Sequence, residues 1–398
     1  MLMFTSQPTN RVSLEDLANE FCETHGITIS KQAIQERFND YAVIFMQKLL
    51  KEQLLRQLSF LQDKRLTKHF TRLRIKDSTR FSLPPEYASL YKGHGGMAGP
   101  AQISIQFEYD LIENKIMHLD FTGANRNDQQ DSKETLYNIK KGELLIRDLG
   151  YAGMGYMKHI SHNEAYFLNR LNSKTIAYDK SKRPIDYQKI IKKLTRHSIP
   201  CMEIQAFLLV DKEWLPTRLI ISKVDAATYQ KRIQKTSLQT QKKGHKVSDA
   251  YRVSAWLNLF VTNIPHAWLA AKDVRDTYSL RWQIELIFKI WKSQCGIHKI
   301  ASVKIQRFQC ELIAKFLWIL LHWQLFRIIQ KNVKVLLSTC KFYKIAHRLS
   351  QHLKIAISNP LKLLRWFDLI FQRAPKKYQI ESKKGKPQLV TTLLNLLA

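Results

Sequence analysis

The sequence predicts an α/β protein in which a mixed sheet lies between helical regions at both ends of the chain. Three observations predict this class. Residues 1 to about 70 carry helical patterns, apolar and polar side chains alternate from residue 71, and residues beyond 262 are helical again. With 398 residues, the chain is long enough for two or three domains with their own cores.

The first region is predicted to form two helices separated by a short turn. Ser13 is a suitable N-cap for a helix that begins at Leu14, Gly26 ends this helix, and Ser30 caps the next one. This arrangement is typical both of a helix-turn-helix that reads DNA and of a plain helical hairpin. The sequence leaves both alternatives open.

The region after residue 70 has the alternating pattern of a sheet. Between residues 103 and 109 every second side chain is apolar, as in a strand with one buried face. Residues 112–114 then indicate a turn into a returning strand. The expected elements are, in order, a strand at 71–81, a hairpin of 103–109 and 115–121, a helix at 128–139 and a strand at 143–148.

The middle of the chain is predicted to be rich in strands and interrupted by basic segments. Two basic polar segments lie at 178–196 and 230–248. The second segment suits either a DNA-facing loop or a solvated helix or loop, and both alternatives stay open. Strands are expected around these segments at 165–171, 203–210, 218–224 and 254–262.

Charge is the unusual feature of the composition. The chain has 64 Lys and Arg against 33 Asp and Glu, which gives a net charge of +31. Such a charge attracts polyanions, so nucleic acid is the expected partner and an anionic membrane surface is the rival. The five cysteines form no CxxC pair and are expected to be reduced thiols of a cytoplasmic protein.

The N-terminus carries no apolar signal core, and the most apolar run, 312–329, is expected to be a buried helix. A membrane span needs about 20 apolar residues. We therefore expect no membrane partner. Four polar or charged side chains interrupt the run: Lys315, His322, Gln324 and Arg327.

The segment 275–293 is predicted to form one helix with a polar stripe. At about 100° per residue, four polar side chains fall within about 60° of one another, opposite an apolar stripe. A carboxylate is thereby expected to point outward between cationic and hydroxyl groups, which suits a metal ion beside a phosphodiester. An amphipathic surface helix with one ordinary Glu–Arg pair is the alternative. The polar stripe is Tyr278, Arg281, Glu285 and Lys292, and the apolar stripe is Leu280, Ile284, Ile287 and Trp291.

The spacing Tyr278-x2-Arg281-x3-Glu285-x6-Lys292 resembles the Y-R-E-K signature of the insertion-sequence-four family of DDE transposases. The preceding residues 261–265 (VTNIP) are also similar to this family, and the similarity extends over roughly residues 30–330. The resemblance implies two earlier aspartates on sheet strands. Residues 74–79 (RIKDST) resemble the first aspartate segment, and residues 144–151 (LLIRDLGY) resemble the second.

The resemblance implies three residues that are catalytic and hold two Mg²⁺ ions, with Mn²⁺ as a substitute: Asp77, Asp148 and Glu285. It also implies three contacts to DNA phosphates, from Tyr278, Arg281 and Lys292. Four other carboxylates compete for these roles. Asp110 is expected at a hairpin turn, Asp128 and Asp131 at the start of a helix, and Asp120 near the site but ranked lower.

As in the family, the implied reaction begins with water attacking at a transposon end to free a 3′-OH. This hydroxyl forms a hairpin in relatives of this type, and after the hairpin reopens the 3′-OH joins target DNA. The implied partners are double-stranded DNA, as terminal inverted repeats and as target, and a second copy in a homodimeric synaptic complex. The implied location is the bacterial cytoplasm, at the nucleoid.

The implied fold is a ribonuclease-H-like mixed-sheet catalytic core with a β-rich insertion, flanked by helical regions. A relative that only binds DNA and a stand-alone metal-dependent nuclease are the alternative functions. The expected divisions are a helical DNA-binding region at 1–68, the first part of the core at 69–161, the insertion at 162–262, the helical remainder of the core at 263–330 and a helical C-terminal region at 331–398.

Overall fold

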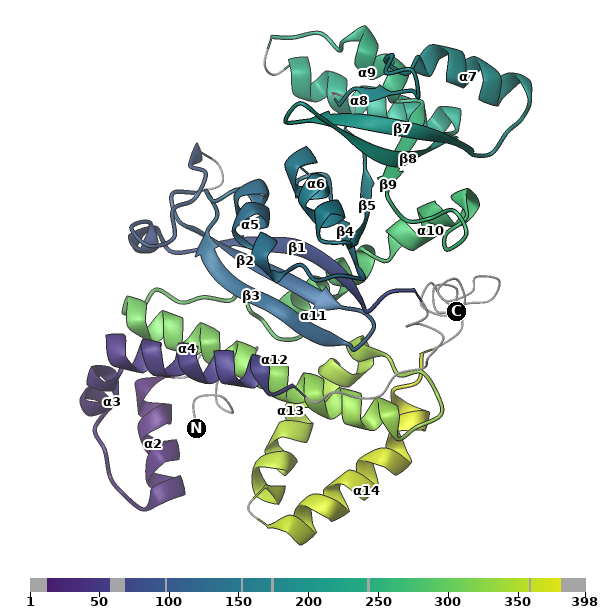
Figure 1. The fold of residues 1–398 in the computed structure, drawn as a ribbon. Coiled ribbons are helices and arrows are strands. Elements are labelled where there is room, and N and C mark those ends of the chain that lie inside the picture. Colours follow the sequence, from purple (N-terminus) through teal and green to yellow (C-terminus); the bar gives the residue numbers. More distant parts are fainter. Residues whose placement is uncertain are drawn as a thin grey trace.

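The computed structural model describes residues 13–57, 69–96, 99–151, 153–172, 175–241, 244–357 and 359–380. At its centre is one mixed sheet. Within these residues its nine strands lie in the order β3-β2-β1-β4-β5-β9-β8-β7-β6 (Figure 1). β4 pairs in parallel with both β1 and β5, and the other neighbours are antiparallel. The sheet is therefore continuous from one hairpin to the other.

Eight strands agree with the predicted positions to within a few residues, with two differences at their starts, and the two-residue β6 was not predicted. The strand predicted at 218–224 begins already at Glu213, and the strand predicted at 254–262 begins at Leu257 because Ser248 caps a short helix before it. The strands are β1 (Arg72–Ser82), β2 (Gln102–Asp110), β3 (Lys115–Gly123), β4 (Glu143–Arg147), β5 (Tyr166–Arg170), β6 (Ala177–Tyr178), β7 (Met202–Val210), β8 (Glu213–Lys223) and β9 (Leu257–Thr262).

The helices surround this sheet (Figure 1). They are α2 (Leu14–His25), α3 (Lys31–Arg37), α4 (Asp40–Leu55), α5 (Asp128–Glu134), α6 (Met154–His162), α7 (Tyr187–Arg196), α8 (Ala226–Gln241), α9 (Asp249–Ser254), α10 (Val274–Ser279), α11 (Trp282–Ser293), α12 (Ile305–Lys331), α13 (Thr339–Ala356) and α14 (Pro360–Lys377). Short 3₁₀ turns lie at Pro85–Tyr87, Leu136–Asn138 and Ala271–Asp273.

The predicted helix starts and stops at the N-terminal end are confirmed. The Ser13 and Ser30 hydroxyls accept hydrogen bonds from the first turns of α2 and α3, and Gly26 ends α2 with a φ of 67°. In the basic segment 230–248, the described residues as far as 241 belong to α8. Every residue of α8 is described and none is buried, so this part is a solvated helix. Residues 242–243 lie outside the described part of the chain.

The single helix predicted at 275–293 is wrong in one respect, because two helices, α10 and α11, occupy this segment. Between them, Leu280 and Arg281 keep right-handed helical angles, but their amides donate to carbonyls three residues back. Such a 3₁₀ turn has about 3.0 residues per turn, so side-chain directions drawn at a constant 100° do not carry across it. The helix predicted at 128–139 likewise ends at Glu134 and continues as a 3₁₀ turn.

Helices α11 and α12 cover the apolar face of the sheet. The ring of Trp291 in α11 lies 4.6 Å from that of Phe107 in β2 and 5.2 Å from that of Phe316 in α12, which forms three packed layers. By length and composition alone α12 could cross a membrane, but 78% of its most apolar window is buried inside the structure. The predicted buried helix at 312–329 is thus confirmed.

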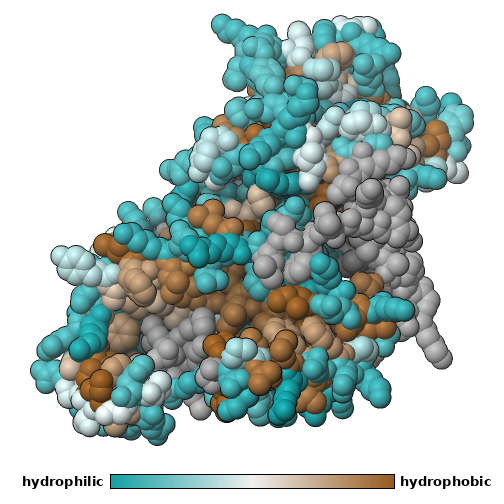
Figure 2. Space-filling view, turned by 60° about the horizontal axis from the view of Figure 1, so that its bottom comes forward, coloured by the Kyte–Doolittle hydropathy of each residue, from teal (hydrophilic) through white to brown (hydrophobic). Residues whose placement is uncertain are grey.

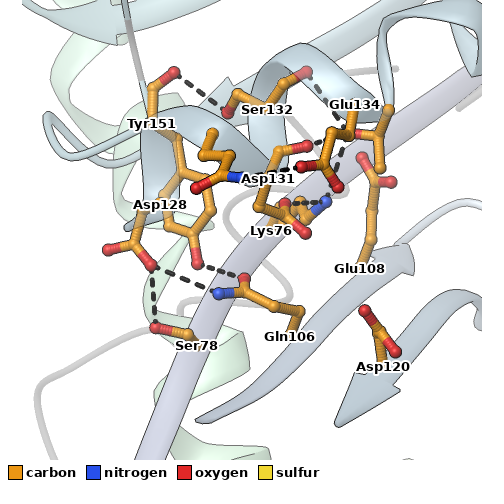
Figure 3. A network of polar contacts seen from close by, with 12 residues as sticks. Lys76, Ser78, Gln106, Glu108, Asp120, Asp128, Asp131, Ser132, Glu134 and Tyr151 are labelled. Atoms are coloured by element: carbon orange, nitrogen blue, oxygen red, sulfur yellow. Dashed lines mark hydrogen bonds and ion pairs between the residues drawn. The ribbon is translucent and has the colours of Figure 1, made fainter. Parts of the chain in front are cut away.

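The opposite face of β1, β2 and β4 carries buried charges of both signs. Arg74 pairs with Glu108 at 2.8 Å and with Glu143 at 2.6 Å, and Arg147 pairs with Glu108 at 3.0 Å. Lys76 pairs with Asp131 of α5, and both side chains are completely buried (Figure 3). Cations and anions alternate in this network, so each buried charge has an opposite charge beside it.

The two ends of the molecule differ in surface character. Figure 2 shows mostly hydrophilic side chains over the end formed by α7, α8 and the β7–β8 hairpin, and apolar patches over the N- and C-terminal helices. The exposed apolar side chains of these helices include Tyr41 and Phe45 in α4 and Leu361 and Leu364 in α14.

Candidate active site

Two parallel strands bring Asp77 and Asp148 together. β1 and β4 pair so that Lys76 lies opposite Arg147, which places the two aspartates at the next position of neighbouring strands. Asp148 directly follows the last residue of β4, where the chain leaves the sheet. Because side chains alternate along a strand, Asp77 points away from the buried charge network and toward the face that α11 covers.

Helix α11 supplies the third carboxylate and Arg281 connects all three. The Arg281 guanidinium donates to Asp77 at 2.9 Å and to Glu285 at 2.7 Å, and its Nε lies 4.0 Å from Asp148 Oδ1. Three carboxylates that are far apart in the chain therefore surround one cation.

The site is open on the carboxylate side and closed behind the arginine. The Asp77, Asp148 and Glu285 side chains are 21%, 47% and 51% exposed, whereas that of Arg281 is 10% exposed. The carboxylate of the polar stripe, Glu285, points outward as expected, whereas Arg281 and Tyr278 of the same stripe are both buried. These two side chains are buried because they face the ends of β1 and β4, where Arg281 contacts Asp77 and Tyr278 contacts Asp148.

Tyr278 and Lys292 hold the borders of the site. The Tyr278 hydroxyl donates to Asp148 Oδ1 at 3.3 Å, and its ring packs 5.2 Å from that of Phe260 in β9. Lys292 donates to the backbone carbonyl of Arg80 at 3.1 Å. Arg80 lies in β1, after Asp77 in the chain. Tyr278 thus contacts the carboxylate cluster directly, and Lys292 fastens α11 to β1.

Electrostatics at Asp77 favour a bound cation. The pKa of Asp77 is raised to about 6, mainly by burial and also by the negative charges of Asp148 and Glu285, while the Ser78 amide and Arg281 act in the opposite sense. A group that ionises at such cost among other carboxylates is stabilised by added positive charge. Carboxylate oxygens are also the ligands that Mg²⁺ prefers.

The donor set therefore fits a hard divalent cation, although Arg281 lies among the donors. Within the described residues, no three His, Cys, Asp or Glu side chains are arranged so that they could hold a metal ion as they stand. The guanidinium of Arg281 would have to withdraw before metal ions could bind between the carboxylates.

The competing carboxylates have other partners. As predicted, Asp110 stabilises a turn, where it accepts from the amides of Leu73 and Ile112. Asp120 pairs with Arg126 at 3.1 Å. Asp128 begins α5 as predicted. Its contacts to β1 and β2 were not predicted, although the alternation of polar side chains along both strands was a signal for them.

Comparison with known proteins shows which family this chain resembles. A family model described as the transposase DDE domain matches residues 68–321. The transposase for insertion sequence element IS231F of Bacillus thuringiensis subsp. israelensis is 30% identical over 403 residues, which cover 94% of this chain and 84% of the relative. The transposase for IS1151 of Clostridium perfringens is 30% identical over 324 residues, which cover 77% of this chain and 68% of the relative.

A mixed α/β sheet with this acidic cluster, inside a matched DDE domain, defines an enzyme that acts on DNA. The chain belongs to the insertion-sequence-four family of DDE transposases.

Proposed function

We propose that this transposase cleaves DNA at transposon ends in a metal-dependent reaction and joins the freed 3′-OH to target DNA. The observation that carries the proposal is the contact of Asp77, Asp148 and Glu285 with one guanidinium. The net charge of +31 supports it, because a strongly basic chain attracts the DNA backbone.

Asp77, Asp148 and Glu285 would hold two Mg²⁺ ions, with Mn²⁺ as a substitute. Such ions supply activation of the attacking oxygen and stabilisation of the leaving oxygen in an in-line displacement. Asp77 lies in β1 and Asp148 at the end of β4, and the pairing of these two strands fixes the distance between the two carboxylates. Glu285 completes the set from α11.

Arg281 would exchange its partners when metal ions bind. Its planar fork, which now contacts carboxylates, suits a phosphate equally well. The Tyr278 hydroxyl stays protonated, because burial and the nearby Asp148 charge raise the pKa of Tyr278, so it can donate to a phosphate oxygen. Lys292 would add a third phosphate contact from the same helix.

The sheet order supports a ribonuclease-H-like core. In the order β3-β2-β1-β4-β5 the strands β1, β4 and β5 are parallel, and the two candidate aspartates lie on β1 and at the end of β4. We place this core at 69–161 and 263–330, with the β-rich insertion at 162–262. Helices of the 1–68 region would bind transposon ends in the cytoplasm, at the nucleoid.

The C-terminal helices of the 331–398 region would pair two copies, because two DNA ends must be processed together. The exposed leucines of α14, Leu361 and Leu364, support this role, since a contiguous apolar surface favours association. The working complex would then be a homodimer on the inverted repeats and target DNA.

The test uses a supercoiled plasmid that carries the gene with its flanking DNA, incubated with the purified protein and Mg²⁺. The wild type is expected to cleave at the repeats and to yield joined products. Glu285→Gln should cleave far more slowly while binding the same DNA, because it removes one of the three carboxylates that would hold the metal ions. Asp276→Asn, an exposed carboxylate in α10, is the matched control and should behave as the wild type.

Two outcomes distinguish the alternative functions. Cleavage without any joined product would indicate a stand-alone nuclease. Retention of DNA by a wild type that never cuts it, with Mg²⁺ or Mn²⁺, would indicate a relative that only binds DNA. Either result contradicts the proposed reaction.

A further inference from the structure

We propose that Asp128 is a positioning residue for the carboxylate site. It fixes the relative positions of the segments around Asp77 and Asp148 without touching reacting atoms. The inference rests on the proposed function, because positioning has a purpose only if the carboxylates bind metal ions. It assigns a role to a carboxylate that the motif does not include.

One oxygen of Asp128 collects hydrogen bonds from two strands. Asp128 Oδ1 accepts from Ser78 Oγ in β1 at 3.2 Å and from Gln106 Nε2 in β2 at 3.3 Å (Figure 3). It also accepts from the Arg80 guanidinium of β1 at 3.0 Å. Ser78 directly follows Asp77, and its amide donates to Asp77 Oδ1 at 2.8 Å. Asp128 is thus one residue removed from the first candidate aspartate.

The same side chain reaches the loop after Asp148. Its Oδ2 lies so close to Gly150 that a Cβ added there would meet it at 3.3 Å. The Tyr151 hydroxyl donates to Gln106 Oε1 at 2.7 Å (Figure 3). The Tyr151 amide donates to the Asp148 carbonyl. The D-x-G-Y turn that ends in Tyr151 therefore shares its partner Gln106 with Asp128.

A third link leads to helix α11. Arg80 donates its guanidinium to Asp128, and its backbone carbonyl accepts from Lys292 of α11. Contacts of Asp128 therefore lead to all three segments that carry the candidate carboxylates: β1, the loop after β4, and α11.

Asp128 does not have these contacts merely because it begins a helix. The N-cap of α5 is Asn127, whose side chain accepts from the Gln130 amide at 2.7 Å, so the cap is complete without Asp128. Ser78 and Arg80 point to the sheet face opposite Asp77, since side chains alternate along β1. Asp128 on that face cannot reach the reacting atoms, and any influence on the site must pass through its partners.

Partners of this kind commonly change metal affinity when they are removed. Loss of an outer hydrogen-bonding group typically weakens metal binding 10–100-fold. Asp128→Ala removes the acceptor and the charge, whereas Asp128→Asn keeps one acceptor oxygen and loses only the ion pair with Arg80. A graded effect, with Asn between wild type and Ala, is therefore expected.

The experiment measures Mn²⁺ binding by calorimetry without DNA, and amide hydrogen exchange at 77–80 and 148–151 in metal-free protein. Asp128→Ala is expected to bind Mn²⁺ about tenfold or more weakly and to exchange faster in both segments. The matched control is Asp120→Asn, since Asp120 lies on the neighbouring β3 and pairs with Arg126 only at the sheet edge. It should match the wild type in both measurements.

Each outcome of this experiment supports or overturns the positioning role of Asp128. If Asp128→Ala lowers the melting temperature but binds Mn²⁺ as tightly as the wild type, Asp128 is only structural and the inference is overturned. If the Ala variant does not fold, Asp128→Asn carries the same test, and unchanged Mn²⁺ affinity and exchange there would overturn it. A wild type that binds no Mn²⁺ would instead refute the proposed function, and this inference with it.

Discussion

The buried pair of Lys76 and Asp131 allows a quantitative stability prediction. Both side chains are 0% exposed, so neither charge can be solvated if its partner is removed. Lys76→Met keeps the length of the side chain and leaves the Asp131 carboxylate in the core. Breaking such a pair typically costs about 3–5 kcal/mol of unfolding free energy.

A second cation near Asp131 places the expected loss toward the lower end of this range. Arg126 Nη2 lies 3.7 Å from Asp131 Oδ1 and would partly compensate the carboxylate. We therefore expect Lys76→Met to lose about 3 kcal/mol. The double variant Lys76→Met/Asp131→Leu leaves no unpaired charge at this position and should recover most of the loss.

The assay is urea unfolding followed by tryptophan fluorescence and by far-UV circular dichroism, with coincident curves as the check on a two-state transition. The control is Lys141→Met, which breaks a surface pair with Glu164 whose side chains are 74% and 68% exposed, and should leave the midpoint unchanged. A double variant as unstable as Lys76→Met would refute the reasoning, because the damage would then not come from an unpaired charge.

Three further predictions concern the site and its support. Because burial raises the pKa of Asp77 to about 6, the folded protein binds this proton more tightly than the unfolded chain does. The contribution of Asp77 to the free energy of unfolding should therefore fall as the pH rises from about 4 to about 6. The Mn²⁺ affinity measured by calorimetry should fall below a pH of about 6, because the proton then competes with the metal ion for Asp77. Gly142→Ala should cost about 1–2 kcal/mol in urea unfolding, since φ is +78° and the new Cβ would meet Thr71 Cγ2 at 3.1 Å. Trp291→Ala, at a side chain 1% exposed, should cost about 3–5 kcal/mol in the same assay, whereas Trp282→Ala, at 59% exposed, should change little.

Local patterns were sufficient to predict most of the sheet. The period-two alternation at 103–109 and the turn after it became the β2–β3 hairpin, because one face of these strands packs on apolar helices. Helix caps at Ser13 and Ser30 were equally local and were confirmed. The order of the strands was not predictable in this way, since β9 joins β5 to β8 through contacts between distant residues.

The arrangement of the candidate site could not be predicted from local sequence patterns alone. Spacing alone placed four polar groups on one helical stripe but could not show that this stripe packs against the end of β4. The buried position of Tyr278 and Arg281 follows from that packing. The resemblance to a family, and not periodicity, connected Asp77 and Asp148 to this stripe. Asp128 was predicted only as a helix start, because its contacts depend on side chains of two strands distant in the chain.

The long sequence separation within the acidic cluster has a consequence during synthesis. Arg281 and Asp77, which contact each other, are 204 positions apart, and the helix that covers the apolar face of β1 ends only at Lys331. At about 5–20 residues per second, Asp77 is synthesised roughly 10–40 s before its partner Arg281. Until then the apolar face of β1 lacks the helices that cover it, and a nascent chain released before α11 lacks Glu285, one of the three carboxylates of the cluster.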